Sequence, residues 1–449
     1  MYYYGIIFDD EMFRNIFETN LGESTSFVNY HIIIWVAILG LIPSIFILKT
    51  TIIYQTFFKE IFYKFISILI SILVIVTLYI LYFEDISSIA RNNKYLSRYI
   101  IPTYFTVNFI KYVNETFFKS KLQYTKLGLD AKLIKNNQQK NNLLIVVVGE
   151  TARSKNYELN GYSRNTNQYT KLHNVISFQN VSSCGTATAI SVPCMFSTLP
   201  RKQYNHDKAI NQDNLINILK RAGLHQEWLD NDNGCKSVCN DIDNVRIKSS
   251  KKNKWCNGLS CIDEVLVEET KNKLSNLPNK DSIIFLHLIG SHGPTYYDRY
   301  PKEHKIFLPD CQRSDIQNCT KEQLINSYDN TIAYSDYVMS ELIRLLKQQE
   351  KKYNTAFLYV SDHGESLGEY GLYLHGAPYF IAPEEQTKVP MLMWFSDSFI
   401  SENNINVYKL KYNAKNQEYS HDNFFHSILG LMGVQTNVYD KKLDIFSYS

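Results

Sequence analysis

The sequence lacks an excess of charge of either sign. Lys and Arg number 47 against 44 Asp and Glu, and the formal net charge is +3. A chain that binds nucleic acid through the phosphate backbone needs a marked basic excess on at least one face. We therefore expect no nucleic-acid partner.

Cysteine is absent before Cys184, and no two cysteines have the Cys-x-x-Cys spacing. This absence excludes a zinc ribbon, which needs two such couples. An even number of closely spaced cysteines is instead typical of disulfides formed in an oxidising compartment. The spacing predicts four disulfides outside the cytoplasm: Cys184–Cys194, Cys235–Cys239, Cys256–Cys261 and Cys311–Cys319.

The start of the chain lacks the basic segment and the short apolar run of a cleaved signal peptide. It has two long apolar runs instead, over residues 28–48 and 65–83, and both carry no Asp, Glu, Lys or Arg. Each run is long enough to cross a hydrocarbon layer of ~30 Å. Two buried core helices are the alternative, but a soluble helix normally keeps a polar stripe. The runs predict a transmembrane hairpin, with both of its ends on one side of the membrane.

These observations divide the chain into three parts. Residues 1–85 form a predicted membrane domain, residues 86–142 a linker, and residues 143–449 a domain outside the cytoplasm, for which the features below predict a periplasmic catalytic role. Residues 101–118 within the linker are aromatic and weakly amphipathic. This segment is expected either to lie on the membrane surface or to be a solvated helix.

From residue 143 onward, apolar strand-like runs alternate with helical patterns. The runs cover residues 143–148, 282–289, 355–360 and 389–395, and helical patterns cover 214–222 and 321–349. Continuous apolar runs are typical of strands buried on both faces. We predict an α/β fold with a mostly parallel sheet between helices.

Three of these strands end in residues that bind metals. Glu150 follows the first run, His292 the second, and the pair Asp362 and His363 the third. Ligands in such sheets bind beyond the carboxyl ends of the strands. Carboxylates and imidazoles suit Zn²⁺, with Mn²⁺ as its main rival. His287 lies within a strand and is interpreted as a buried core histidine.

The run from Ser182 to Ala189 contains small hydroxyl residues and a glycine before an apolar stretch. This pattern is typical of the first turn of a helix, where a phosphate group binds well. A hydroxyl of this segment is the candidate nucleophile. The residue pattern does not choose among Ser182, Ser183, Thr186 and Thr188.

Four segments resemble the lipid A phosphoethanolamine transferases, a family of the alkaline-phosphatase superfamily. They read VVVGETARSKNYELNGYSRNT, SSCGTATAISVPCMFS, GSHGPTYYDRYP and YVSDHGESLGEYGLYLHGAP. The resemblance implies a zinc enzyme anchored in the inner membrane with a periplasmic α/β domain. It also implies that phosphatidylethanolamine is the donor, and that lipid A or another surface glycan or protein is the acceptor.

The resemblance also implies roles for single residues. Thr186 is expected to be the nucleophile and, with Glu150, Asp362 and His363, a ligand of one tightly held zinc ion. His292 and His375 are expected to handle the phosphoethanolamine group or to hold a second, weaker zinc. The expected donor-contacting residues are Asn15, Thr19, Glu23 and Lys236.

Two departures from the family pattern accompany this resemblance. Family members have five membrane helices, and the present sequence opens just before the fourth, so a late start or a shortened form is expected. Asn233 stands where many members have a serine near Lys236. The competing functions are a phosphoglycerol transferase, a phosphodiesterase and a membrane-anchored binding protein without catalysis. A sulfatase is disfavoured because the Cys-x-Pro-x-Arg pattern is absent.

Overall fold

The computed structural model describes residues 7–19, 24–25, 28, 30–51, 54, 56–83, 98, 100–118, 122–134 and 140–448. The chain divides into two compact units. One comprises Met1–Phe27 and Tyr112–Ser449, and the other comprises Val28–Lys111. The first 27 residues, which the sequence assigned to the membrane domain, thus group with the catalytic unit. The reason is that helix α1 (Asp10–Glu18) buries Met12 and Phe13.

A seven-stranded sheet forms the centre of the catalytic unit. Its order is β3-β11-β8-β2-β7-β5-β6. The five strands from β8 to β6 are parallel, and β11 is antiparallel to both of its neighbours, β8 and β3, so β3 runs in the same direction as the five. The strand bounds, in that order, are Ile176–Phe178, Met391–Phe395, Tyr353–Ser361, Asn141–Gly149, Ser282–His287, His225–Asp230 and Asp243–Arg246.

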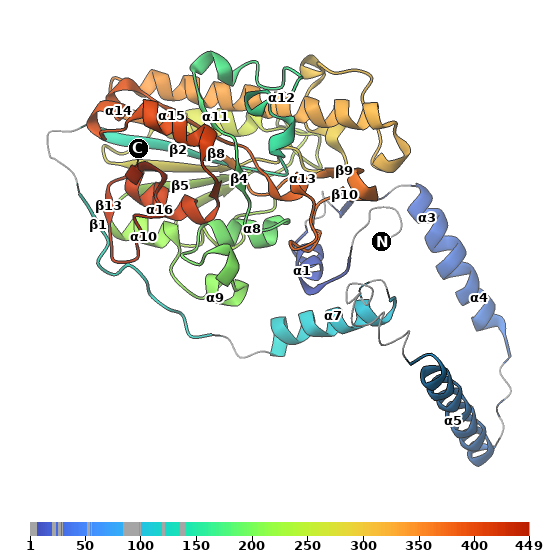
Figure 1. Ribbon diagram of the computed structural model, residues 1–449. Coiled ribbons are helices and arrows are strands. Elements are labelled where there is room, and N and C mark those ends of the chain that lie inside the picture. The colour runs from blue at the N-terminus through green and yellow to red at the C-terminus, as the bar shows by residue number, and fades with distance from the viewer. Residues whose placement is uncertain are drawn as a thin grey trace. The chain divides into compact units, whose positions relative to one another are not determined.

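Helices cover both faces of this sheet, because alternate residues of its central strands point into two separate cores. Leu144, Val146 and Val148 of β2 belong to one core, whereas Leu143 and Ile145 belong to the other. The first core is closed by α8, α10 and α16 and the second by α11 and α12, on opposite sides of the sheet in Figure 1. These helices span Thr188–Met195, Leu215–Arg221, Asp422–Leu431, Glu264–Ser275 and Lys321–Gln349. The predicted α/β class with a mostly parallel sheet is confirmed.

Shorter elements complete the catalytic unit. The helices are α9 (His206–Ile210), α13 (Glu384–Thr387), α14 (Asp397–Glu402) and α15 (Val407–Asn416). Among the described residues, short strands also form three two-stranded sheets: β1 (Lys132–Leu133) with β13 (Val434–Gln435), β9 (Ser366–Leu367) with β10 (Tyr373–Leu374), and β4 (Val181–Ser182) with β12 (Tyr419–Ser420). Four disulfides join the same cysteine couples that the sequence spacing indicated.

The other unit contains two apolar helical segments. The first runs from Tyr30 to Lys49 as α3 (Tyr30–Val36), a π-helical turn (Ala37–Leu41) and α4 (Ile42–Lys49). The π turn precedes Pro43, whose ring nitrogen cannot donate to the preceding turn. The second segment is α5 (Phe57–Leu81), and α7 (Thr103–Val113) follows it.

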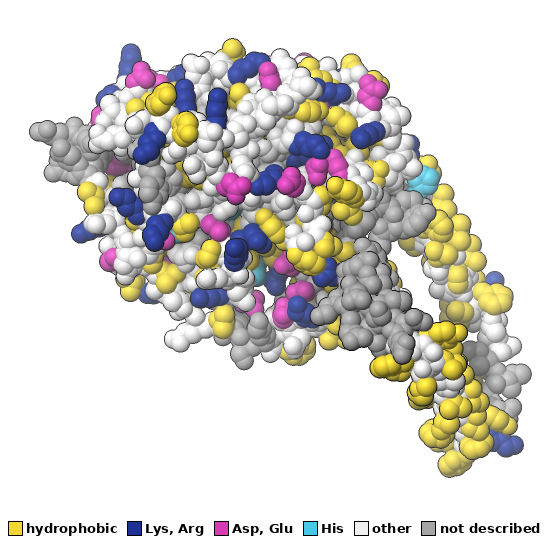
Figure 2. Space-filling model, in the orientation of Figure 1, with side chains coloured by type: hydrophobic (Ala, Val, Ile, Leu, Met, Phe, Trp, Pro, Cys, Tyr) yellow, Lys and Arg dark blue, Asp and Glu magenta, His cyan; other side chains and the backbone are white. Residues whose placement is uncertain are grey.

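Both apolar segments have the length and composition of membrane spans. The most apolar 18 residues of each segment include no buried residue in this structure. Figure 2 shows their surfaces covered by hydrophobic side chains. Helix α5 begins eight residues before the apolar run that predicted it. The added turns carry Glu60 and Lys64, which form an ion pair of 3.3 Å one helical turn apart. Charged residues therefore extend the helix beyond its apolar part.

Candidate active site

Residues at the ends of β2 and β8 form a buried cluster at one edge of the sheet. Glu150 follows β2, and Asp362 and His363 follow β8; all three side chains have no exposed surface. The backbone N–H of Asp362 donates to the carbonyl of Gly149 at 2.9 Å, so the two strand ends continue to pair beyond the regular ladder. The sheet register thus brings together three of the metal ligands that the sequence suggested.

The Nε2 atom of His363 lies at the centre of this cluster. It is 3.5 Å from Oε1 of Glu150, 3.3 Å from Oδ2 of Asp362 and 3.4 Å from Oγ1 of Thr188. The Nδ1 atom of the same ring is 2.9 Å from the carbonyl of Gly364, so Nδ1 carries the proton and donates it. The Nε2 lone pair therefore faces the carboxylates.

The backbone around Glu150 is tightly constrained. Thr151 has φ of 52°, and its N–H donates to Oδ1 of Asp362 at 3.2 Å. Gly290 has φ of 47°, and a Cβ atom there would lie 2.7 Å from the carbonyl oxygen of Glu150. A larger residue at position 290 would displace Glu150. Strained and closely packed backbone of this kind is concentrated at functional sites.

Burial and like charge shape the protonation of the cluster. Burial, with the carboxylates of Asp362 and Asp232, raises the pKa of Glu150 well above its usual range. Burial likewise raises the pKa of Asp362. For His363, burial and the nearby His375 hold the pKa well below its usual range, so the ring is neutral. Neutral imidazole and carboxylate are the forms that bind a metal.

Unsatisfied atoms show that the cluster fits a cation. Oε1 of Glu150 and Oδ2 of Asp362 are buried and have no hydrogen-bond partner among the described residues. Leaving carboxylate oxygens buried without a donor is costly. One oxygen from each acid, together with a nitrogen of His363, lies within 4.8 Å of the others. The donor set, two carboxylates and an imidazole, suits Zn²⁺.

The candidate nucleophile requires a correction. The hydroxyl of Thr186 donates to the carbonyl of Ala377 at 2.7 Å, whereas the hydroxyl of Thr188 donates to Oε2 of Glu150 at 3.0 Å. Thr186 lies in a bend before Ala187, the extended residue that caps helix α8, and Thr188 is the first residue of that helix. The change from loop to helix turns only the second hydroxyl toward the acids. The residue pattern had included Thr188 among four alternatives, but the family resemblance had selected Thr186.

His292 and His375 lie beside the cluster. The ring centroid of His375 is 4.5 Å from that of His363 and 5.6 Å from that of His292. Nδ1 of His375 is 3.0 Å from Oε2 of Glu365, whose other oxygen accepts from Tyr296 at 2.8 Å. Glu365 therefore orients the His375 ring, a role that the sequence reasoning did not assign.

Helix α1 contributes residues from the start of the chain. Asn15 and Thr19 lie on one face of it, since the Thr19 hydroxyl donates to the carbonyl of Asn15 at 2.7 Å. The helix contacts α8, and Glu18 lies 3.7 Å from the amino group of Lys236. This ion pair brings α1 next to Lys236, as expected for two segments that contact the donor. The residue of α1 that forms it is Glu18, which was not among the expected residues. Glu23 lies outside the described residues.

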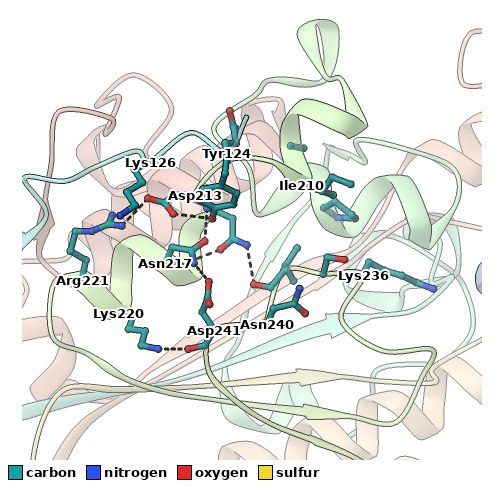
Figure 3. A pocket seen from close by; sticks show the side chains of 16 residues that line it. Tyr124, Lys126, Ile210, Asp213, Asn217, Lys220, Arg221, Lys236, Asn240 and Asp241 are labelled. Carbon is teal, nitrogen blue, oxygen red and sulfur yellow. Dashed lines mark hydrogen bonds and ion pairs between the residues drawn. The ribbon is translucent and has the colours of Figure 1, made fainter. Parts of the chain in front are cut away.

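A pocket of ≈ 630 Å³ lies on the side of α8 that carries Pro193. Lys126, Lys220, Arg221 and Lys236 line it, together with Asp213 and Asp241. Figure 3 shows that Lys236 lies apart from the other labelled cations and extends away from them. Arg221 is already engaged, because it donates to Asp213 and to two backbone carbonyls. Lys236 lines the pocket, but its amino group lies beside Glu18 of α1.

Sequence reasoning missed one strand that reaches the site. Strand β5 lies next to β7, and its end carries Asp230 and Asp232. Its sequence, HQEWLD, is short and polar, so it lacks the apolar run that marked the other strands. The signal that could have identified this strand is the pair of acids, Asp230 and Asp232, that follows Trp228 and Leu229. His287 is not a fully satisfied core histidine either, because its Nε2 atom has no hydrogen-bond partner among the described residues.

The fold and the acid–imidazole cluster define a member of the sulfatase superfamily, and the sulfatase family model matches residues 142–434. A second family model, described as phosphoethanolamine transferase EptA/EptB, matches residues 1–117. EptA of Escherichia coli strain K12 is 40% identical over 445 residues, covering 98% of this chain and 81% of that protein. The chain belongs to the EptA family of phosphoethanolamine transferases, as the sequence resemblance indicated.

Two solved structures resemble the chain closely. The integral membrane lipooligosaccharide phosphoethanolamine transferase A of Neisseria meningitidis superposes with a TM-score of 0.94 at 37% identity, covering 99% of this chain and 83% of that one. The C-terminal periplasmic domain of EptC from Campylobacter jejuni superposes with a TM-score of 0.64 at 43% identity, covering 72% and 97%. The chain is an integral membrane protein with a C-terminal periplasmic catalytic domain, as predicted.

Proposed function

We propose that the protein transfers phosphoethanolamine from phosphatidylethanolamine to lipid A, with Thr188 as the covalent carrier. The observation that carries this proposal is the hydroxyl of Thr188, which lies among Glu150, Asp362 and His363. A threonine hydroxyl is a weak nucleophile until its environment favours the alkoxide. This is the hydroxyl that the cluster surrounds with metal-binding groups.

Glu150, Asp362, His363 and Thr188 would hold one zinc ion tightly. When bound, the ion supplies positive charge that favours the threonine alkoxide and neutralises a phosphoryl oxygen. The two carboxylates and the neutral imidazole keep these charges fixed in a water-poor site, so little reorganisation accompanies the reaction. His292 and His375 are the proposed place of a second, weaker zinc, as an alternative to a role in proton transfer.

The reaction has two displacements. Thr188 Oγ1 forms a bond to phosphorus while the bond from phosphorus to the glycerol oxygen breaks, which releases diacylglycerol and leaves phosphoethanolamine on Thr188. A phosphate oxygen of the acceptor then forms a bond to phosphorus, and Thr188 Oγ1 leaves. Thr188 Oγ1 attacks as the alkoxide and leaves as the alkoxide, so its own proton does not enter the cycle. His375, which Glu365 orients, gives a proton to the glycerol oxygen in the first step and takes the proton of the acceptor phosphate in the second.

Asn15, Thr19 and Lys236 are proposed to contact the donor headgroup. Their support is the packing of α1 on the catalytic unit and the ion pair of Glu18 with Lys236. Because the donor and the acceptor are both membrane lipids, anchoring the enzyme in the membrane raises its effective concentration near them. Another surface glycan or a surface protein is the alternative acceptor.

The test is mass spectrometry of lipid A from cells with and without the chain, with T188A as the inactive control. We expect lipid A to gain the mass of one phosphoethanolamine group only when the unaltered chain is present. A gain of phosphoglycerol would identify the related transferase instead. Unchanged lipid A, with the protein folded and in the membrane, would contradict the proposed acceptor.

A further inference from the structure

A second group of metal-binding side chains lies on the other side of Glu150. Strands β2, β7 and β5 are adjacent and parallel, and His287 of β7 pairs with Val148 of β2 and with Asp230 of β5. Glu150 and Asp232 each lie two residues beyond those partners. The register therefore places the imidazole of His287 between two carboxylates that come from neighbouring strands.

The ring of His287 is oriented by Asp230. Its Nδ1 atom is 3.1 Å from Oδ2 of Asp230, and that carboxylate also accepts from Trp228 Nε1 at 3.0 Å and from the N–H of Gly234 at 2.9 Å. Asp230 accepts all these bonds, so the proton on the ring lies on Nδ1 and points to it. A carboxylate that holds one nitrogen of a histidine while the other faces a metal is a recurrent arrangement.

The atoms that face one another across this group are buried and unsatisfied. Nε2 of His287 is 3.9 Å from Oδ2 of Asp232 and 4.0 Å from Oε2 of Glu150, which is too far for hydrogen bonds. Asp232 is 6% exposed, and neither of its carboxylate oxygens has a hydrogen-bond partner among the described residues. Two donors bound at about 2.1 Å to one ion can be up to ~4.2 Å apart, so the spacing accommodates a metal.

Charge balance supports the same conclusion. Four carboxylates, those of Glu150, Asp362, Asp230 and Asp232, are buried within this region. A single divalent ion compensates two of them, and Asp230 is stabilised by its hydrogen bonds from Trp228, Gly234 and His287. The carboxylate of Asp232 is then the one left without a hydrogen-bond partner among the described residues, which is costly at such burial. A cation next to Asp232 removes this cost.

We propose that Glu150, Asp232 and His287 bind another divalent metal ion of the zinc type, distinct from any ion at His292 and His375, with Glu150 shared between it and the first ion. The inference rests on the proposed function only for the first ion, which Glu150, Asp362 and His363 hold. The mixed set of one imidazole and two carboxylates suits Zn²⁺, with Mn²⁺ as its rival. The second ion holds Glu150 in its ionised form and fixes the carboxylate that faces Thr188.

The experiment counts zinc in the full chain, purified in detergent, stripped with a chelator, reloaded with Zn²⁺ alone and freed of excess metal. All variants carry H375N, so that the neighbouring histidine pair does not contribute to the count. Metal per chain is measured by elemental mass spectrometry against protein from amino-acid analysis. D232N and H287Q remove the new site, D362N removes the first, and D243N is a control with the same chemical change on the exposed strand β6.

We expect two zinc ions in the H375N parent and in D243N, and one ion in D232N and in H287Q. One ion in the parent, lost in D362N but kept in D232N, would overturn the second site and leave the proposed function standing. Two ions retained in a folded D232N would also overturn it, since the second ion would lie elsewhere. No bound ion in the parent would overturn both proposals. If neither site variant folds, the count in the parent decides between two ions and one.

Discussion

At the scale of single residues, catalysis depends on which threonine faces the acids. T188A removes the hydroxyl that bonds Glu150, and we expect transfer from a fluorescent phosphatidylethanolamine to fall by at least ~10³-fold, as for other covalent nucleophiles. T186A is the matched control, since its hydroxyl bonds Ala377, and we expect a loss below about tenfold for one neutral hydrogen bond. A larger loss of transfer in T186A than in T188A would identify Thr186 as the nucleophile.

A second prediction at this scale concerns His421 and pH. Nδ1 of His421 accepts from the N–H of Cys184 at 3.1 Å, and Nε2 donates to the carbonyl of Ser361 at 2.9 Å. Burial lowers the pKa of this ring to about 4. Its unfolded pKa of about 6.5 is higher, so the unfolded chain binds more protons between these values and stability falls as pH falls from 6.5 toward 4.

At pH 5 this group alone accounts for a loss of ~2 kcal/mol relative to pH 7. Thermal unfolding of the purified chain at both pH values measures the effect, with H421Q as the comparison. The drop in midpoint between pH 7 and pH 5 should be smaller in H421Q than in the unaltered chain. Equal drops in the two proteins would show that His421 is not held neutral.

At the scale of elements, the apolar strands and the long helices could be predicted from the sequence. Strands β2, β7 and β8 are continuous apolar runs, and their ends located Glu150 and Asp362. Strand β5 could not be found this way, because a polar edge-like sequence still forms a strand once β7 and β6 pair with it. The choice between Thr186 and Thr188 depended on which residue begins α8. The exact first residue of a helix is difficult to predict from the neighbouring sequence.

The docking of α1 leads to a prediction at the scale of elements. Met12 and Phe13 fix this helix to the catalytic unit, and Met12 approaches Gly376 next to His375. We expect M12A/F13A to raise the KM for the donor about tenfold, the equivalent of ~1.4 kcal/mol, with zinc content unchanged. Ile16 is exposed on the same helix, so I16A is the control and should keep its KM. A fall in kcat with KM unchanged would mean that α1 does not position the donor.

At the scale of the whole molecule, the chain combines two apolar helices with a disulfide-containing domain. Composition alone indicated this organisation, because the apolar runs and the cysteines occupy separate parts of the sequence. It did not indicate that the first residues group with the catalytic unit. That grouping depends on tertiary burial of Met12 and Phe13, which a nine-residue amphipathic helix does not reveal by itself.

The most direct test of the account is to map the covalent intermediate. The chain is incubated with phosphatidylethanolamine without an acceptor, and its peptides are analysed by mass spectrometry. We predict phosphoethanolamine on Thr188, its absence in T188A, and its disappearance from the unaltered chain when lipid A is added. An adduct on Thr186 or on a histidine, or efficient transfer by a T188A variant, would contradict the account.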